Sequence, residues 1–246
     1  MADGTKLRDK RAKSRDDSGT TARGEETRAR ILAAALARFR RRGFDKTTMR
    51  EIATAAKVAL GAAYYYFPSK DAIVMEYYRD TQRRSTELTA RAFAESTDVR
   101  ERIASVIHTR LDVLSGDRRL LSAIFRGVAD PDAPTSVFSP ETEPIRAESM
   151  RELEDALAAW EGFTELDPDT RRVLVLALWG LEMGVILYFV HDTSPDQKKT
   201  RDLVDGAVDL VAAILPTAPL LAPILGDQVA SILRSAGLLP EAPRRS

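Results

Sequence analysis

Apolar residues recur along most of the chain with the period of an amphipathic α-helix. Between residues 25 and 42 they fall three or four positions apart, at Ile31, Leu32, Ala35, Leu36 and Phe39. Similar spacing is found over residues 70–95, 100–114, 118–128 and 144–160. Each of these segments is therefore predicted to be a helix that packs one face against its neighbours.

Two further predicted helices are more strongly apolar. Residues 168–191 include a run of 18 residues with one charged residue, Glu182, at its middle. That length reaches the lower limit for a membrane span, but a central carboxylate is costly in lipid, so we expect a soluble helix. Residues 202–215 form the second helix. Both are too apolar to face water alone.

Two segments lack the helical period. Residues 129–144 are rich in Pro, Asp, Ser and Thr, and they are expected to form either a flap over a cavity, with Phe138 as its inward plug, or a mobile surface loop. Residues 216–223 are predicted to be a proline-rich connector. A last short helix should follow and end at Gly237.

Residues 47–70 predict two short helices joined by a tight turn. Thr48 is a favourable N-cap residue, and Glu51 three positions later completes the pattern of a capping box. The first helix should end near Ala56. The second is predicted from about Leu60 to Tyr66, because a proline at position 68 disfavours helix in the residue before it.

The second of these helices should place two neighbouring tyrosines away from the core. If Val58, Ala63 and Phe67 pack inward, then Leu60, Gly61, Tyr64 and Tyr65 point away from the core. Small residues let a helix backbone approach a DNA groove closely, and phenol hydroxyls can reach phosphates. A helical hairpin with ordinary surface tyrosines is the alternative.

The segment from about residue 25 to residue 70 resembles the DNA-binding domain of the TetR family of bacterial transcriptional regulators. The positions that agree in order and spacing are Arg30-Ile31-Leu32-Ala33-Ala34-Ala35, Phe39, Gly43-Phe44, Thr47-Thr48, Ile52-Ala53, Val58, Gly61, Tyr64-Tyr65-Tyr66-Phe67 and Pro68-Ser69-Lys70. They cover roughly a fifth of the chain. The remainder matches only in helical character and length.

The resemblance implies an all-α protein, with an N-terminal three-helix helix-turn-helix head over residues 25–70 and a larger helical ligand-binding and dimerisation domain over residues 71–239. It implies a cytoplasmic homodimer that represses transcription from a pseudo-palindromic operator until a small apolar or amphipathic effector releases it. Double-stranded operator DNA, the effector and a second copy of the chain are the expected partners, with no membrane. The expected DNA contacts are Thr47, Thr48, Arg50, Leu60, Gly61, Ala62, Tyr64, Tyr65, Tyr66 and Lys70.

Three positions depart from the usual family pattern. Lys57 stands where a glycine commonly makes the turn between the two helices, so the turn should be less tight or slightly strained. Ala59 replaces a common serine or threonine that would cap the second helix. Leu60 stands where a polar residue often reads bases, and it can offer only an apolar contact, for example to a thymine methyl group.

The net charge of zero conceals a separation of charge along the chain. Residues 1–70 contain 17 Lys and Arg against 8 Asp and Glu, whereas the remaining residues contain 20 against 29. A basic head on an acidic body fits DNA binding. Residues 1–24, which have almost no large apolar side chain, are predicted to be a disordered basic arm that either touches DNA or is a solvated tail. Residues 240–246 should be frayed.

Candidate residues in the body are less specific. The expected cavity lining, each member of which could equally be ordinary core, is Phe125, Phe138, Met150, Trp179, Met183 and Tyr188. The expected dimer contacts are Gly180, Gly184, Val208 and Val211, since the two glycines allow close approach of helices. Glu182 is expected either to hold an effector or, preferably, to pair with an arginine across the dimer interface. The acidic series that includes Glu152 is expected to be the solvated face of its helix.

Other classes of function have weaker support in the sequence. The chain has no cysteine and only two histidines, His108 and His191, which lie far apart. No nucleophile, nucleotide-binding or metal-binding motif is present, so neither catalysis nor a cofactor or metal is expected. The main alternative to a DNA-binding regulator is a helical ligand-binding or adaptor protein whose head contacts protein.

Overall fold

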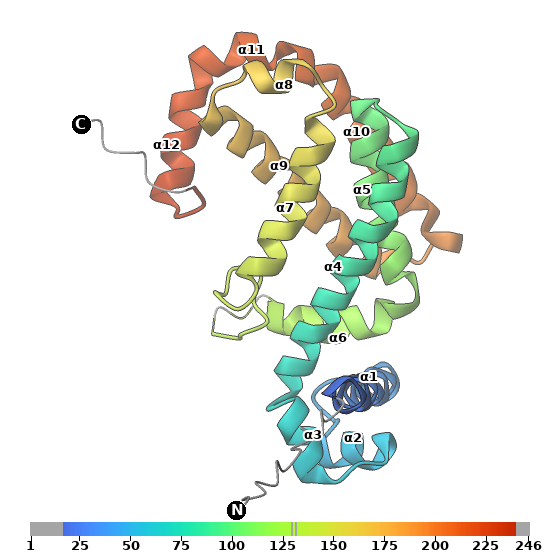
Figure 1. Ribbon diagram of the computed structural model, residues 1–246. Helices are drawn as coiled ribbons and strands as arrows, with labels where there is room; N and C mark the ends of the chain where they lie inside the picture. The colour runs from blue at the N-terminus through green and yellow to red at the C-terminus, as the bar shows by residue number, and fades with distance from the viewer. Residues whose placement is uncertain (1–16, 129, 131, 240–246) are drawn as a thin grey trace, which may run out of the picture.

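The computed structural model describes residues 17–128, 130 and 132–239, and these form helices and short connections with no strand among them (Figure 1). The predicted all-α fold is confirmed. The head consists of α1 (Asp17–Arg42), α2 (Met49–Ala56) and α3 (Leu60–Tyr66). The body consists of α4 (Lys70–Glu95), α5 (Val99–Leu114), α6 (Arg118–Val128), α7 (Glu143–Leu157), α8 (Gly162–Glu165), α9 (Pro168–His191), α10 (Lys198–Ile214), α11 (Ala218–Leu221) and α12 (Asp227–Ser235).

Local signals in the sequence set the boundaries of the head helices. The capping box at the start of α2 is complete, because Glu51 donates its backbone N–H to the Thr48 hydroxyl and the Glu51 carboxylate accepts the Thr48 N–H. Gly43, with φ +85°, ends α1 in the left-handed region. Lys57 ends α2 in the same region, with φ 55° and ψ 45°, so the strain expected at this turn is present.

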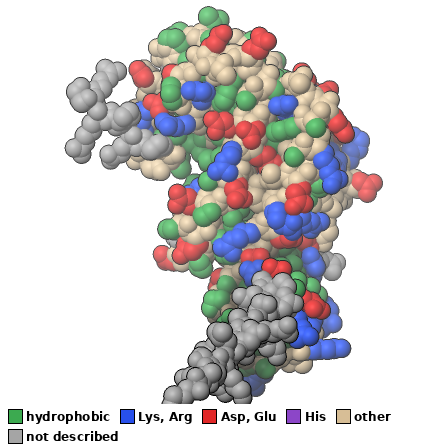
Figure 2. Space-filling model, viewed as in Figure 1, with side chains coloured by type: hydrophobic (Ala, Val, Ile, Leu, Met, Phe, Trp, Pro, Cys, Tyr) green, Lys and Arg blue, Asp and Glu red, His purple; other side chains and the backbone are tan. Residues whose placement is uncertain are grey.

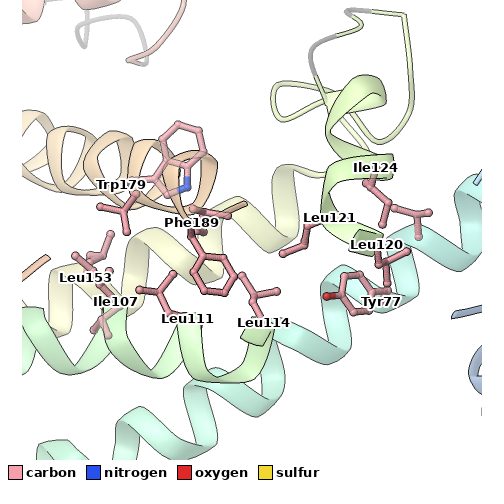
Figure 3. Close-up of a cluster of buried hydrophobic side chains, with 14 of the residues drawn as sticks. Tyr77, Ile107, Leu111, Leu114, Leu120, Leu121, Ile124, Leu153, Trp179 and Phe189 are labelled. Atoms are coloured by element: carbon pink, nitrogen blue, oxygen red, sulfur yellow. The ribbon is translucent and has the colours of Figure 1, made fainter. Parts of the chain in front are cut away.

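A single long helix joins the head to the body. In Figure 1, α4 rises from the head along the body, and α6 lies across the body directly above α1. Figure 3 shows Tyr77 of α4 pointing toward the apolar side chains that begin α6. The core continues through α5, α7 and α9, where buried side chains meet at Ile107, Leu111, Leu114, Leu153, Trp179 and Phe189.

Two predicted boundaries are wrong. Helix α1 begins at Asp17, so residues 17–24 are helical rather than part of a disordered arm. Those residues carry no large apolar side chain, and therefore the hydrophobic period could not detect them. The rest of the predicted arm, residues 1–16, and the predicted tail over residues 240–246 lie outside the described residues.

The predicted connector over residues 216–223 is also wrong, because the segment continues as short helical turns. Its three prolines, Pro216, Pro219 and Pro223, each stand in the first turn of one such segment. Proline lacks the N–H that would continue an α-helical bond ladder, and the helical bonding changes type at the segments that contain Pro216 and Pro223, which are 3₁₀ and π.

Two helical segments are long and apolar enough to cross a membrane by length and composition alone, residues Pro168–His191 and Pro195–Ile224. The first is α9, whose central carboxylate, Glu182, is fully buried among other helices of the body. Core helices of soluble proteins pass the same test. On the face shown in Figure 2, acidic and basic side chains are interspersed over the surface of the body.

Replacing the strained turn residue should stabilise the head. The left-handed conformation costs an L-residue roughly 1–2 kcal/mol, and a glycine loses about 0.5–1 kcal/mol more backbone entropy on folding. Lys57→Gly is therefore expected to raise the free energy of unfolding by about 0.5–1 kcal/mol in urea titrations. Ala55→Gly, on the exposed face of α2, is the control and should lower it by about 1 kcal/mol. Destabilisation by both variants would contradict strain at Lys57.

Candidate nucleic-acid interface and effector pocket

The helix-turn-helix head presents five of the predicted DNA contacts at its surface. Tyr65 is 82% exposed and Tyr64 is 48% exposed on α3. Thr48, Arg50 and Gly61 are exposed beside them, at the N-cap and first turn of α2 and on the first turn of α3. A side chain added at Gly61 would meet no other atom of the chain within 4 Å. This surface therefore offers hydroxyl groups, a guanidinium and an open stretch of helix backbone.

The other predicted DNA contacts are used inside the head. Thr47 is buried, and its hydroxyl donates to the Gly43 carbonyl at 2.8 Å, so its side chain is not available to DNA. Lys70 is half-buried, donates to the Phe44 carbonyl at 2.7 Å and lies over the Phe44 ring. A third group is half-buried on α3, namely Leu60, Ala62 and Tyr66. Leu60 packs partly against the hydrophobic core, which limits its reach toward bases.

The body contains a cavity of about 160 Å³ between α4, α5, α6, α7, α9 and the loop before α7. Half of the residues on its wall are polar, but most of its surface is apolar. The apolar members are Leu114, Leu121, Ile124, Phe125, Val137, Ile145, Trp179, Met183 and Ile186, and the polar members are Tyr77, Tyr78, Thr81, Gln82, Arg110, Thr135, Thr142, Arg146 and Ser149. A cavity with a mostly apolar surface and some polar side chains on its wall is typical of small-molecule sites.

Three of the six predicted lining residues contribute to this pocket, Phe125, Trp179 and Met183. Met150 and Tyr188 do not. The loop before α7 does cover the pocket, but Val137 lines it, whereas Phe138 is 60% exposed and stacks edge-on against Trp179 from outside. The prediction of Phe138 as the plug is wrong. Val137 points into the pocket instead, and the side chain of the next residue points in a different direction.

A buried polar cluster forms one end of the pocket. Arg110 of α5 donates to Gln82 of α4 at 2.5 Å, to Glu152 of α7 at 3.1 Å and to Glu182 of α9 at 3.1 Å. Glu182 also accepts a hydrogen bond from Ser149 at 3.0 Å. The guanidinium thereby connects four of the five helices that surround the cavity, α4, α5, α7 and α9.

This cluster corrects two expectations. Glu182 pairs with an arginine of its own chain, not with one across a dimer interface. Glu152 is 5% exposed rather than on a solvated face. Burial raises the pKa of Glu152, and the nearby Arg110 opposes that rise only partly. One Glu152 oxygen, Oε1, is buried without a hydrogen-bond partner among the described residues.

A second set of bonds joins the pocket wall to the head. Tyr77 lines the pocket, and its hydroxyl donates to Asp117 Oδ2 at 3.0 Å. The other oxygen of Asp117, in the turn before α6, accepts a hydrogen bond from Arg40 in the last turn of α1. Burial, followed by the charge of Asp117, raises the pKa of Tyr77. The phenol therefore stays a hydrogen-bond donor at neutral pH.

The predicted dimer contacts differ in how far they are exposed. Gly180 and Gly184 are exposed on α9 with open space beyond them. Val208 is fully buried against the rest of the chain and cannot meet a partner, while Val211 is half-buried. Helices α9 and α10 also expose large apolar side chains at Leu187, Tyr188, Leu203, Leu210 and Ile214.

The residues that sequence reasoning missed are polar residues on apolar faces. Gln82, Arg110 and Glu152 each stand three or four positions from buried residues of the same helix, and that placement was the available signal. Asp117 carried no such signal. Among the described residues there is no group of three or more His, Asp or Glu side chains that could hold a metal ion.

A helix-turn-helix head on a separate helical body defines a class of DNA-binding transcriptional regulators. The chain belongs to the TetR family within that class. The family model described as bacterial regulatory proteins, tetR family, matches residues 31–77, and the one described as the tetracyclin repressor-like C-terminal domain matches residues 102–227.

Individual relatives agree with this assignment. The HTH-type transcriptional dual regulator CecR of Shigella flexneri is 27% identical over 165 residues, which cover 63% of this chain and 72% of CecR. A Syntrophomonas wolfei protein described as a TetR-family regulator has a similar fold, with a TM-score of 0.63, 17% identity, and coverage of 77% of this chain and 96% of the other. FadR of Bacillus subtilis, solved with stearoyl-CoA, gives a TM-score of 0.58 at 20% identity, with coverage of 73% and 96%.

The buried carboxyl of Glu152 should make stability depend on pH. A group whose pKa is raised on folding contributes its full stability below its unfolded value, here near 4.5, and loses that contribution as the pH rises through the folded value. In urea titrations, the free energy of unfolding of Glu152→Gln minus that of wild type should therefore increase as the pH is raised from 5 to 8. Glu154→Gln, an exposed change on the same helix, should follow wild type. A difference in the free energy of unfolding between Glu152→Gln and wild type that does not change with pH would contradict this explanation.

Proposed function

We propose that this protein is a homodimeric repressor that binds a pseudo-palindromic operator and releases it when an apolar or amphipathic small molecule enters the body. The observation that carries the proposal is the pair of hydrogen bonds that runs from the pocket wall through Asp117 to the head. A ligand can act on DNA binding only through a difference in its interactions with two states of the protein. A ligand in the pocket could alter these bonds and so favour one position of the head over another.

The exposed part of the head supports binding in the major groove. Two heads of a dimer would enter successive major grooves with centres about 34–36 Å apart. Tyr64 and Tyr65 would position α3 on the phosphates, Gly61 would permit close approach of its backbone, and Arg50 would add an electrostatic contact. Thr48 would lie at the same surface.

The exposed apolar face of α9 and α10 supports dimerisation. Isolated surface leucines are ordinary, but several exposed apolar side chains, together with exposed glycines, on two long helices suit a helix–helix interface. Gly180 and Gly184 would let the partner's helices approach, with Val211 at the edge of the interface. The spacing of the heads would then follow from the tilt of each α4.

Coupling through Asp117 supports a change of head position on ligand binding. Asp117 receives hydrogen bonds from both Tyr77 and Arg40, so a ligand that displaces the Tyr77 hydroxyl weakens the hold of the body on α1. Allosteric couplings are typically about 1–3 kcal/mol, which is the scale of one such charge-assisted hydrogen bond. Bacillus subtilis FadR, with the same fold, was solved with stearoyl-CoA, which makes acyl-chain amphiphiles sensible first probes.

Fluorescence anisotropy on the DNA that flanks the protein's own gene tests the DNA-binding part. Affinity should fall steeply with salt, with one dimer bound per site. Arg50→Ala should weaken binding to all sequences similarly and reduce the salt slope by about one per head. Arg151→Ala, an exposed arginine of the body, is the control and should change neither. Absence of binding to this DNA and to random DNA at low salt would refute the regulator proposal.

The hydroxyl of Tyr77 should be required for the effector response. With decanoate as the probe, Tyr77→Phe is expected to bind operator and decanoate nearly as wild type does, but to release the operator about tenfold less readily, because its link to Asp117 is gone. Tyr78→Phe is a matched control, since the Tyr78 hydroxyl on the same wall has no partner among the described residues. Equal release by Tyr77→Phe and wild type would exclude this route.

A further inference from the structure

The effector pocket has one cationic group on its wall that no carboxylate neutralises. Arg146 of α7 is half-buried beside the loop before α7, and it donates one hydrogen bond to the Val137 carbonyl at 2.6 Å. Among the described side chains, no acidic group forms an ion pair with Arg146. The other arginine of the wall, Arg110, is already paired with Glu152 and Glu182.

Arg146 lines the cavity, and its position on α7 leaves its charge without an acidic partner among the described residues. One turn away, Thr142, Ser149 and Met150 are uncharged, and the acidic neighbour Glu143 is exposed and forms no ion pair with Arg146 among the described residues. A guanidinium has five N–H donors, and the Val137 carbonyl uses one of them. Holding such a charge half-buried in apolar surroundings costs free energy unless an anion accompanies it. The protein itself provides no such anion in the described residues.

We infer that the effector of the proposed repressor is a carboxylate amphiphile, whose head binds Arg146 beneath the loop before α7. A single uncompensated positive charge matches a monoanion, and a carboxylate can accept two parallel hydrogen bonds from a guanidinium. The charge determines which end of the ligand lies at this loop. This inference rests on the proposed function in one respect, which is that the molecule bound in the pocket is the effector.

The rest of the wall suits the apolar body of such a molecule. Hydrocarbon and aromatic side chains line it from two facing helices, Leu121, Ile124 and Phe125 from α6 and Trp179, Met183 and Ile186 from α9. Tyr77, the first residue of the link to the head, lines the same cavity.

Isothermal titration calorimetry on the full chain at pH 7.5 tests the inference with octanoate, decanoate and dodecanoate, each compared with the alcohol of equal chain length. At least one acid should bind about tenfold or more tightly than its alcohol, because charge-assisted hydrogen bonds are roughly twice as strong as neutral ones. Arg146→Met should abolish that preference and leave affinity for the alcohol within about twofold. Arg146→Lys should keep part of it.

Arg151→Met is the matched control, since it removes the same charge from an exposed position on the same helix. It should leave both affinities unchanged. If Arg146 serves only to hold the loop through Val137, Arg146→Met would weaken acid and alcohol alike, and the inference would be overturned. It would also be overturned if no acid bound more tightly than its alcohol.

The repressor proposal fails separately from this inference. Acid binding that requires Arg146 but leaves operator affinity unchanged would support the anion site and contradict the effector response. Operator release by the alcohols, with no preference for the acids, would support the repressor and contradict the role of Arg146.

Discussion

The body depends on a buried guanidinium that must be bonded on several sides at once. Arg110 is 6% exposed, and it is held by Gln82, Glu152 and Glu182 from three other helices. A buried charge left without partners would cost several kcal/mol, so the four helices can pack only in an arrangement that satisfies it. The cavity lies beside this cluster, and its polar end is therefore a consequence of how the helices are joined.

The need of buried polar groups for partners also explains how the head is held on the body. Apolar contacts between α1 and α6 have no preferred direction, whereas the carboxylate of Asp117 binds Arg40 and Tyr77 on opposite sides. The bond to Asp117 raises the pKa of Arg40, and burial beside Asp117 raises that of Tyr77. Both groups therefore remain donors over the whole physiological range. In the proposed mechanism, the position of α1 would respond to the state of Tyr77, a residue of the pocket wall.

Periodicity predicted most of the helices, because an amphipathic stripe is a local property of the chain. It predicted α4, α6 and α9 to within a residue or two at either end. It missed the start of α1 and the turns after α10, where the helix carries no stripe or is interrupted by prolines. Part of the pocket wall was also found, since Trp179 and Met183 stand on the apolar run of α9. Phe138 was assigned wrongly, since direction within a turn depends on backbone angles that periodicity does not report.

By itself, the sequence determined the helix-turn-helix head, its capping box, the strained turn at Lys57 and the separation of basic head from acidic body. These follow from residues close together in the chain. Only the tertiary structure decided which polar residues meet. Glu182 and Arg110 lie 72 positions apart, and Arg40 and Asp117 lie 77 apart. Their pairing depends on how whole helices pack, because a charge in an apolar stripe indicates that a partner is needed without indicating where in the chain the partner lies.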